Sequence, residues 1–261
     1  MYPTIAPDIE QQQLYAAIHH LHPQLEHFIC KASTASTNDD ALALYQQGYR
    51  SALVISQRQT QGRGQHQREW ISPAGNIFLS ALLELERPVD GRFALECGLN
   101  ILHSPSLTQL EHLQLKWAND LYSSKGKWGG ILVEPIHSTQ IIVGIGINVF
   151  PIAQQYTTLN QAVTSLTELG LSHYERSAFL VDIYQAILNA VQWFNHNSQN
   201  LAQRYNSVAA FKDQWVILHR QQHADLMGYF RGIQNDGALL IQQASDIHPT
   251  VCYDGRLVIP D

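Results

Sequence analysis

Cysteine is scarce in this sequence: its 261 residues contain only Cys30, Cys97 and Cys252, which are far apart and odd in number. This pattern predicts neither a disulfide framework nor a C-x-x-C site, so we expect a reducing, cytoplasmic environment. The first residues lack a basic segment followed by an apolar one. No apolar run reaches the length of a bilayer span, so we expect no membrane association.

Positive charge is also scarce, because 16 lysines and arginines face 22 aspartates and glutamates and give a formal net charge of -6. Nucleic-acid binding needs a basic face for phosphate contacts, so this balance argues against DNA as a partner. Only five lysines occur, and Lys116, Lys125 and Lys127 fall within one short segment. That clustering indicates a local electropositive site for an anionic ligand.

Several catalytic motifs are absent from the sequence. It contains no phosphate-binding loop of the form GxxxxGK(S/T), no nucleophile elbow and no HExxH motif. No direct cluster of acidic, cysteine and histidine side chains predicts a metal site. The chain instead offers a glycine- and arginine-rich loop, a lysine-bearing hairpin and a strand that ends at Asn148. These groups suit a reaction that uses ATP through positioning and electrostatic stabilisation, without covalent enzyme chemistry.

Hydrophobic periodicity predicts an α+β chain with a large domain at residues 1–212 and a smaller one at 213–261. We expect helices at residues 9–21, 38–45, 91–103, 162–169 and 174–195, with Thr37 or Asn38 capping the second, and a loop at 151–161. Strands are expected at residues 28–30, 52–56, 76–83, 113–117 and 140–148, together with a hairpin at 116–134. Four short strands, at 215–218, 226–230, 238–241 and 257–259, predict a small all-β module.

The loop at residues 59–70 places Gly62 and Gly64 around Arg63, followed by Arg68 and Trp70. Glycine lets backbone amides approach an anion, and arginine side chains form forked contacts with phosphate or carboxylate. Taken alone, such a loop is more often a solvated surface turn than a ligand site. Its interpretation therefore depends on the hairpin, which would gather Lys116, Asn119, Asp120 and Lys127 around one turn.

Five segments occur in an order and at spacings that resemble one known family. They are Ser36-Thr-Asn38, Gln59 with 62–70, Lys116-Trp-x-Asn-Asp120, Lys127-x-Gly-Gly-Ile-Leu-Val-Glu134 and Gly144-x-Gly-Ile-Asn148. Together they resemble the biotin protein ligases, strongly over about residues 33–150. The resemblance implies a class II synthetase-like catalytic domain, in which helices flank a central mixed or antiparallel β-sheet, and a small C-terminal SH3-like β-barrel.

The resemblance also implies a two-step reaction. Biotin is activated with ATP and Mg²⁺ to biotinyl-5′-AMP, and biotin is then transferred to a lysine of the biotin carboxyl carrier protein of acetyl-CoA carboxylase. By motif match, Lys127 and Arg63 would be catalytic, and Mg²⁺ would accompany ATP through Asp120. The biotin site would comprise Ser36, Thr37, Asn38, Gln59, Arg63, Gly64, Lys127 and Gly130. The nucleotide site would comprise Gly62, Arg63, Arg68, Trp70, Lys116, Asn119, Asp120, Lys127 and Asn148.

The sequence departs from the family pattern at three positions. Gln65 replaces an arginine and Gln67 a glycine in the loop, while Ala118 replaces a proline before Asn119. The family arginine helps to retain the adenylate, so its role is not transferred to Gln65.

Two alternatives remain open: a lipoate or octanoate ligase of the same fold, and a non-catalytic binder of biotin or a nucleotide. The segment before Ser36 has room for a helix and a strand but not for a three-helix DNA reader, so we expect a monofunctional enzyme. We expect a monomer or a homodimer.

Overall fold

The computed structural model describes residues 9–152, 162–220, 223–244 and 246–260. Its α-helices are α1 (Ile9–Leu21), α2 (Thr37–Gln46), α3 (Arg92–Leu102), α4 (Arg176–Asn195) and α5 (Leu201–Asn206), with short 3-10 turns η1 (Gln65–Gln67) and η2 (Pro105–Leu107). Its strands are β1 (His27–Lys31), β2 (Ala52–Ser56), β3 (Ile77–Glu84), β4 (Gln114–Lys116), β5 (Asp120–Ser123), β6 (Gly126–Pro135), β7 (Gln140–Ile147), β8 (Trp215–His219), β9 (Leu226–Ile233), β10 (Leu239–Gln242), β11 (Thr250–Cys252) and β12 (Arg256–Val258).

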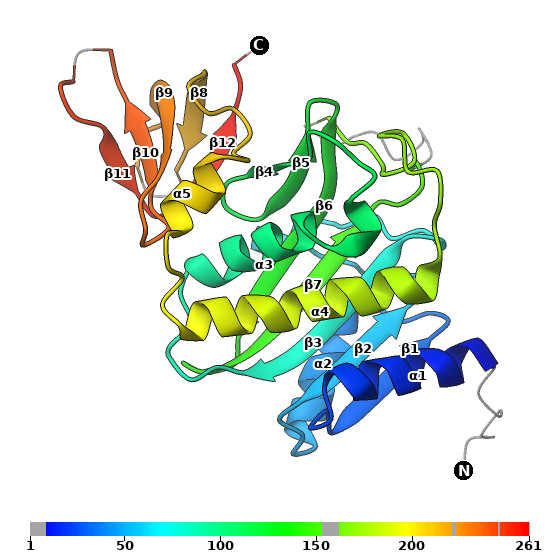
Figure 1. The fold of residues 1–261 in the computed structure, drawn as a ribbon. Coiled ribbons are helices and arrows are strands. Elements are labelled where there is room, and N and C mark those ends of the chain that lie inside the picture. Colours follow the sequence, from blue (N-terminus) through cyan, green and yellow to red (C-terminus); the bar gives the residue numbers. More distant parts are fainter. Residues whose placement is uncertain (1–8, 153–161, 221–222, 245, 261) are drawn as a thin grey trace.

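The larger sheet contains seven strands in the order β1-β2-β3-β7-β6-β5-β4. Only β1 and β2 pair in parallel, and every other neighbouring pair is antiparallel, so the sheet is mixed as expected. Its strands run between helices (Figure 1), with α3 and α4 packed against each other along one face. The predicted α+β class with a central helix-flanked sheet is confirmed.

Both faces of this sheet are apolar, and the two-residue period of the strands separates them. On β3, Leu79 and Ala81 belong to the main core, whereas Leu82 packs in a second cluster with Ala41 and Leu44 of α2. Helix α2 therefore covers the face opposite α3 and α4. Because α2 spans only part of that face, β6 and β7 retain a stretch on which a site can form.

The smaller sheet is antiparallel, in the order β11-β10-β9-β8-β12, and gathers the C-terminal strands (Figure 1). Alternate residues such as Leu226, Phe230 and Ile241 are buried within it. The Trp117 indole donates a hydrogen bond to the carbonyl of Gly237 at 3.0 Å. This bond links the smaller sheet to the connection between β4 and β5. No helix in the described ranges is long and apolar enough to cross a bilayer.

Two sequence predictions are wrong in detail. No helix forms at 162–169: Lys127 donates its backbone amide to Ala162 and accepts from Thr164, so this segment pairs sideways with β6. The cap of α2 is Ser36, one residue before the predicted positions. Strand β11 and helix α5 were not predicted. The predicted loop at 151–161 lies mostly outside the described residues.

The ion pair between Glu96 of α3 and Arg204 of α5 yields a stability prediction. Glu96 is fully buried, and its carboxylate lies 2.6 Å from the Arg204 guanidinium. We predict that Arg204→Ala lowers the free energy of unfolding by about 3 kcal/mol, because it leaves a buried carboxylate without its cation. Urea unfolding would measure the loss. Arg231→Ala, which removes the exposed pair with Asp213, is the control, and equal losses in both variants would contradict the prediction.

Candidate functional site

A cavity of about 370 Å³ opens on the sheet face that α2 leaves uncovered. Its walls are the start of α2, the loop at 59–70, strands β5 to β7 and the start of β12. The structure brings together every predicted site residue around this cavity except Gly62. The lining includes Ser36, Thr37, Asn38, Gln59, Arg63, Gly64, Gln65, Arg68, Trp70, Lys116, Asn119, Asp120, Lys127, Gly130 and Asn148.

Two glycines form the floor of the cavity on β7. A Cβ atom at Gly144 would collide with the Asn38 amide, and one at Gly146 would lie 2.5 Å from the Trp70 indole nitrogen. Side chains from α2 and from the loop therefore lie directly on the strand backbone. This close approach requires glycine, and it explains why the strand at 140–148 combines long apolar residues with two glycines.

Hydrogen bonds fix the groups at the α2 end of the cavity. The Gln59 side-chain oxygen accepts from the backbone amide of Thr37 at 2.8 Å and from its hydroxyl at 3.1 Å. The Gln59 amide nitrogen donates to the Ser72 hydroxyl at 3.1 Å. The Ser80 hydroxyl lies 2.7 Å from the Thr37 hydroxyl and 2.5 Å from the Asn38 oxygen. These contacts present oriented, uncharged donors to a ligand.

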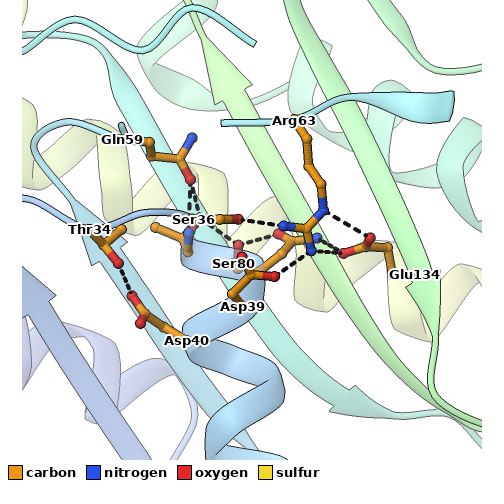
Figure 2. Close-up of polar contacts among 10 residues, drawn as sticks. Thr34, Ser36, Asp39, Asp40, Gln59, Arg63, Ser80 and Glu134 are labelled. Atoms are coloured by element: carbon orange, nitrogen blue, oxygen red, sulfur yellow. Dashed lines mark hydrogen bonds and ion pairs between the residues drawn. The ribbon is translucent and has the colours of Figure 1, made fainter. Parts of the chain in front are cut away.

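The Arg63 guanidinium lies in the centre of a polar cluster (Figure 2). It pairs with the Asp39 carboxylate at 2.7 Å and with Glu134 at 3.2 Å, and it donates to the Ser36 hydroxyl at 3.2 Å. The hydrogen bond to Asp39 is the main cause that raises the pKa of Arg63. Because two carboxylates face one guanidinium, this end of the site carries no excess positive charge.

The loop itself is a narrow hairpin fastened at its base. Trp70 donates its backbone amide to Gly62 at 2.8 Å, and Gly64 donates to Arg68 at 2.7 Å. Gly62 does not line the cavity; a Cβ there would meet the Trp70 carbonyl at 2.5 Å, so its role is to close the hairpin. Gln67 takes a left-handed φ of 58°, a conformation that favours glycine, at the position where the family pattern has one.

Lysines gather at the opposite end of the cavity. Lys127 lies 2.5 Å from the Asp120 carboxylate, and Lys116 lies 3.6 Å from the same group. Arg256 lies near Lys116 at this end, Arg68 also lines the cavity, and Glu69 and Asp120 are the only acidic lining residues of the cavity among those described. Burial lowers the pKa of Lys116; Asp120 opposes this shift, and the charges of Lys127 and Arg256 add to it. This end therefore has a cationic excess.

The two asparagines differ in their partners. Asn119 donates to the carbonyl of Ile131 at 2.7 Å, so its side chain joins the connection between β4 and β5 to β6. Asn148 donates to the carbonyl of Thr164 at 3.3 Å. Within the described ranges its buried side-chain oxygen has no hydrogen-bond partner. An unpaired buried acceptor costs about 1–3 kcal/mol, which a ligand donor would recover.

Sequence reasoning missed several residues of the site. Asp39 and Glu134 hold Arg63, although the sequence separates them by almost a hundred positions. Gly255 and Arg256 reach the cavity from the smaller sheet. A signal existed for Glu134, because it ends the Lys127-x-Gly-Gly segment, but nothing in the sequence pattern connects Arg256 with the lysine hairpin.

Comparisons with known proteins agree with this geometry. Residues 30–148 match a model of the Biotin/lipoate A/B protein ligase family. The biotin–[acetyl-CoA-carboxylase] ligase of Paracoccus denitrificans is 35% identical over 254 residues, which cover 88% of this chain and 96% of that protein. The chain belongs to the biotin protein ligase family. A biotin protein ligase from Aquifex aeolicus, solved with biotin and ATP, has the same fold, with a TM-score of 0.73, 23% identity and coverage of 90% of this chain and 98% of that one.

Some biotin protein ligase relatives are considerably longer. The bifunctional ligase/repressor BirA of Escherichia coli is 31% identical over 205 residues, which cover 75% of this chain and 63% of that protein. The match to the corresponding Salmonella typhimurium protein spans the same 63% of its length. In the described part of this chain, no group of three or more His, Cys, Asp and Glu side chains is arranged to hold a metal ion.

The lowered pKa of Lys116 gives a prediction about pH. An ammonium with a lowered pKa loses its proton at a lower pH than an ordinary lysine, so affinity for inorganic pyrophosphate should decline as the pH rises, and earlier than an ordinary lysine would allow. Lys116→Arg keeps its charge and should shift this decline to higher pH. Calorimetric titrations from about pH 7 to pH 10 would measure both curves, and superimposable curves would contradict the prediction.

Proposed function

We propose that this chain activates biotin with ATP and transfers it to a lysine of an acceptor protein. In the first step, a biotin carboxylate oxygen attacks the α-phosphorus of ATP, which gives biotinyl-5′-AMP and releases pyrophosphate. In the second, a lysine ε-amine attacks the acyl carbon, which forms an amide and releases AMP. Support comes from the family assignment and from relatives named as biotin–[acetyl-CoA-carboxylase] ligases.

One observation carries the proposal: a single cavity has an uncharged, hydrogen-bonding end and a cationic end. Ser36, Thr37, Asn38 and Gln59 suit a neutral polar ring such as the cyclic urea of biotin. We place the biotin carboxylate, where it would join the α-phosphate, next to the Arg63 side chain and the Gly64 backbone. Gly130 leaves space beside Lys127 and Trp70.

The cationic end suits the nucleotide and its triphosphate. Lys127 is the residue we assign to the reacting centre, because negative charge develops on the α-phosphate in both steps. Its ammonium must then exchange the Asp120 carboxylate for a phosphate oxygen. Arg68, Lys116 and Asp120 would surround the triphosphate. Trp70 and Asn148 would contact the nucleoside. Asn119 would keep the β4–β5 connection in place against β6 beside the nucleotide.

Mg²⁺ is part of the proposal as a companion of ATP. The described residues do not form a protein site for it: no group of three or more His, Cys, Asp and Glu side chains is arranged to hold a metal ion, and Asp120 has an oxygen in contact with each lysine. We therefore assign the ion to the nucleotide phosphates, a common arrangement for Mg²⁺, and derive no step from it.

Further aspects belong to the same proposal. The acceptor would be the biotin carboxyl carrier protein of acetyl-CoA carboxylase, by analogy with the names of the relatives. The enzyme would be cytoplasmic and monofunctional, as a monomer or homodimer, without repressor activity. The net charge of -6 supports the absence of DNA binding.

We predict that Lys127→Ala lowers biotin transfer by about 100- to 1,000-fold, the usual cost of losing one group that stabilises developing charge. The assay contains ATP, Mg²⁺, labelled biotin and a biotin carboxyl carrier domain. Lys125→Ala, whose ammonium contacts the Glu168 carbonyl outside the cavity, is the matched control and should retain activity. A parallel reaction with labelled lipoate tests the alternative that the chain is a lipoate ligase. A wild-type protein that binds biotin but transfers neither acid would support a non-catalytic binder.

The position of Gln65 leads to a second prediction. Gln65 lines the cavity at the exposed end of the loop, where an arginine could reach the adenylate. Restoring a charged hydrogen bond should strengthen the hold on biotinyl-AMP by about 1–3 kcal/mol. Gln65→Arg should therefore slow the release of labelled biotinyl-AMP in a filter or dialysis assay, with Gln67→Arg as the control. Unchanged release would refute this.

A further inference from the structure

Glu134 is the second-to-last residue of β6 and contacts two residues that line the cavity, although it does not line the cavity itself. Its carboxylate accepts a hydrogen bond from the Asn38 amide nitrogen at 2.5 Å. It also accepts from the Arg63 guanidinium at 3.4 Å and 3.2 Å through its two oxygens. One side chain thus joins α2 to the loop at 59–70 (Figure 2).

The contact with Asn38 determines which way the amide faces. The Asn38 nitrogen donates to Glu134, and its oxygen accepts from the Ser80 hydroxyl on β3. The Gly144 backbone lies against the other side of the amide, so the group cannot tilt toward the sheet. An asparagine amide has two N–H donors. With the first held by Glu134, the second has a fixed direction for a ligand.

The contact with Arg63 exceeds what charge neutralisation requires. Asp39 already provides one carboxylate for the guanidinium, at 2.7 Å. Glu134 adds a second from the opposite wall, so the guanidinium is held between α2 and β6 and the loop base is fixed relative to both. Four of the five guanidinium N–H groups have partners in Ser36, Asp39 and Glu134, since the contacts are one from Nε, one from Nη1 and two from Nη2.

A purely structural role does not explain this arrangement. The Glu134 side chain is one-third exposed and belongs to neither apolar cluster. A carboxylate at this place contributes little to core stability, yet it determines the geometry of two lining residues that are distant in sequence. Its negative charge also disfavours an anionic ligand at the α2 end of the cavity and leaves the cationic end for phosphate.

We propose that Glu134 is a positioning and specificity-determining residue, which orients Asn38 and Arg63 together so that the α2 end of the cavity accepts a neutral, hydrogen-bonding head group. This inference rests on the proposed function, in which that head group is the cyclic urea of biotin. Glu134 acts through Asn38 and Arg63 and does not contact the reacting atoms.

The test measures biotin and ATP binding by calorimetry for the full chain and for Glu134→Gln, which keeps the shape of the side chain and removes its charge. We expect the Kd for biotin to rise about tenfold, as for the loss of roughly 1.4 kcal/mol, while the Kd for ATP changes less than about twofold. Glu84→Gln, an exposed glutamate at the end of β3, is the matched control and should leave both constants unchanged.

A double-mutant cycle separates positioning from a general loss of structure. In an Arg63→Ala background, Glu134→Gln should cost less biotin affinity than in the wild type, because one of the two groups it orients is gone. Additive effects, an unchanged biotin Kd, or a parallel loss of biotin binding, ATP binding and melting temperature would each overturn the inference. A wild-type chain that binds ATP without binding biotin would refute the proposed function itself, and this inference with it.

Discussion

The close contact of two side chains with the glycine backbone of β7 shapes the site. At Gly144 and Gly146 the strand offers no Cβ atoms, so Asn38 and Trp70 lie directly on the sheet. The position of Trp70 fixes the second arm of the loop, and the position of Asn38 fixes the start of α2. The other lining groups of α2 and of the loop are then placed relative to these two, because both segments carry several functional side chains.

Electrostatics then divides the cavity between two kinds of ligand group. Near α2, one guanidinium faces two carboxylates, and amides and hydroxyls provide the remaining contacts. Near the hairpin, Lys116 and Lys127 share the carboxylate of Asp120. A molecule with a neutral polar ring and a carboxylate tail matches this charge distribution when its carboxylate lies next to a phosphate at the cationic end. The same charge distribution supports the proposed order of biotin and ATP along the cavity.

Much of the architecture could be predicted from the sequence, because apolar alternation at 52–56, 76–83 and 140–148 is a local signal. The ordered motifs likewise identified most of the lining residues. Contacts between distant segments could not be predicted in this way. The helix expected at 162–169 does not form because its amides donate to Lys127 of β6 and to Asn148 and Val149 after β7. The pairing of Asp39 and Glu134 with Arg63 joins three separate elements. Arg256 reaches the site only through the placement of the smaller sheet.

The hairpin form of the loop has a thermodynamic consequence for ligand binding. Its base is already held by Arg63 and Trp70, so a ligand that orders the loop has only the three residues Gln65–Gln67 left to immobilise. At about 1–2 kcal/mol of backbone entropy per residue, this amounts to about 3–6 kcal/mol, far less than ordering the entire loop. The smaller entropic cost leaves more of the interaction energy to appear as affinity for the intermediate.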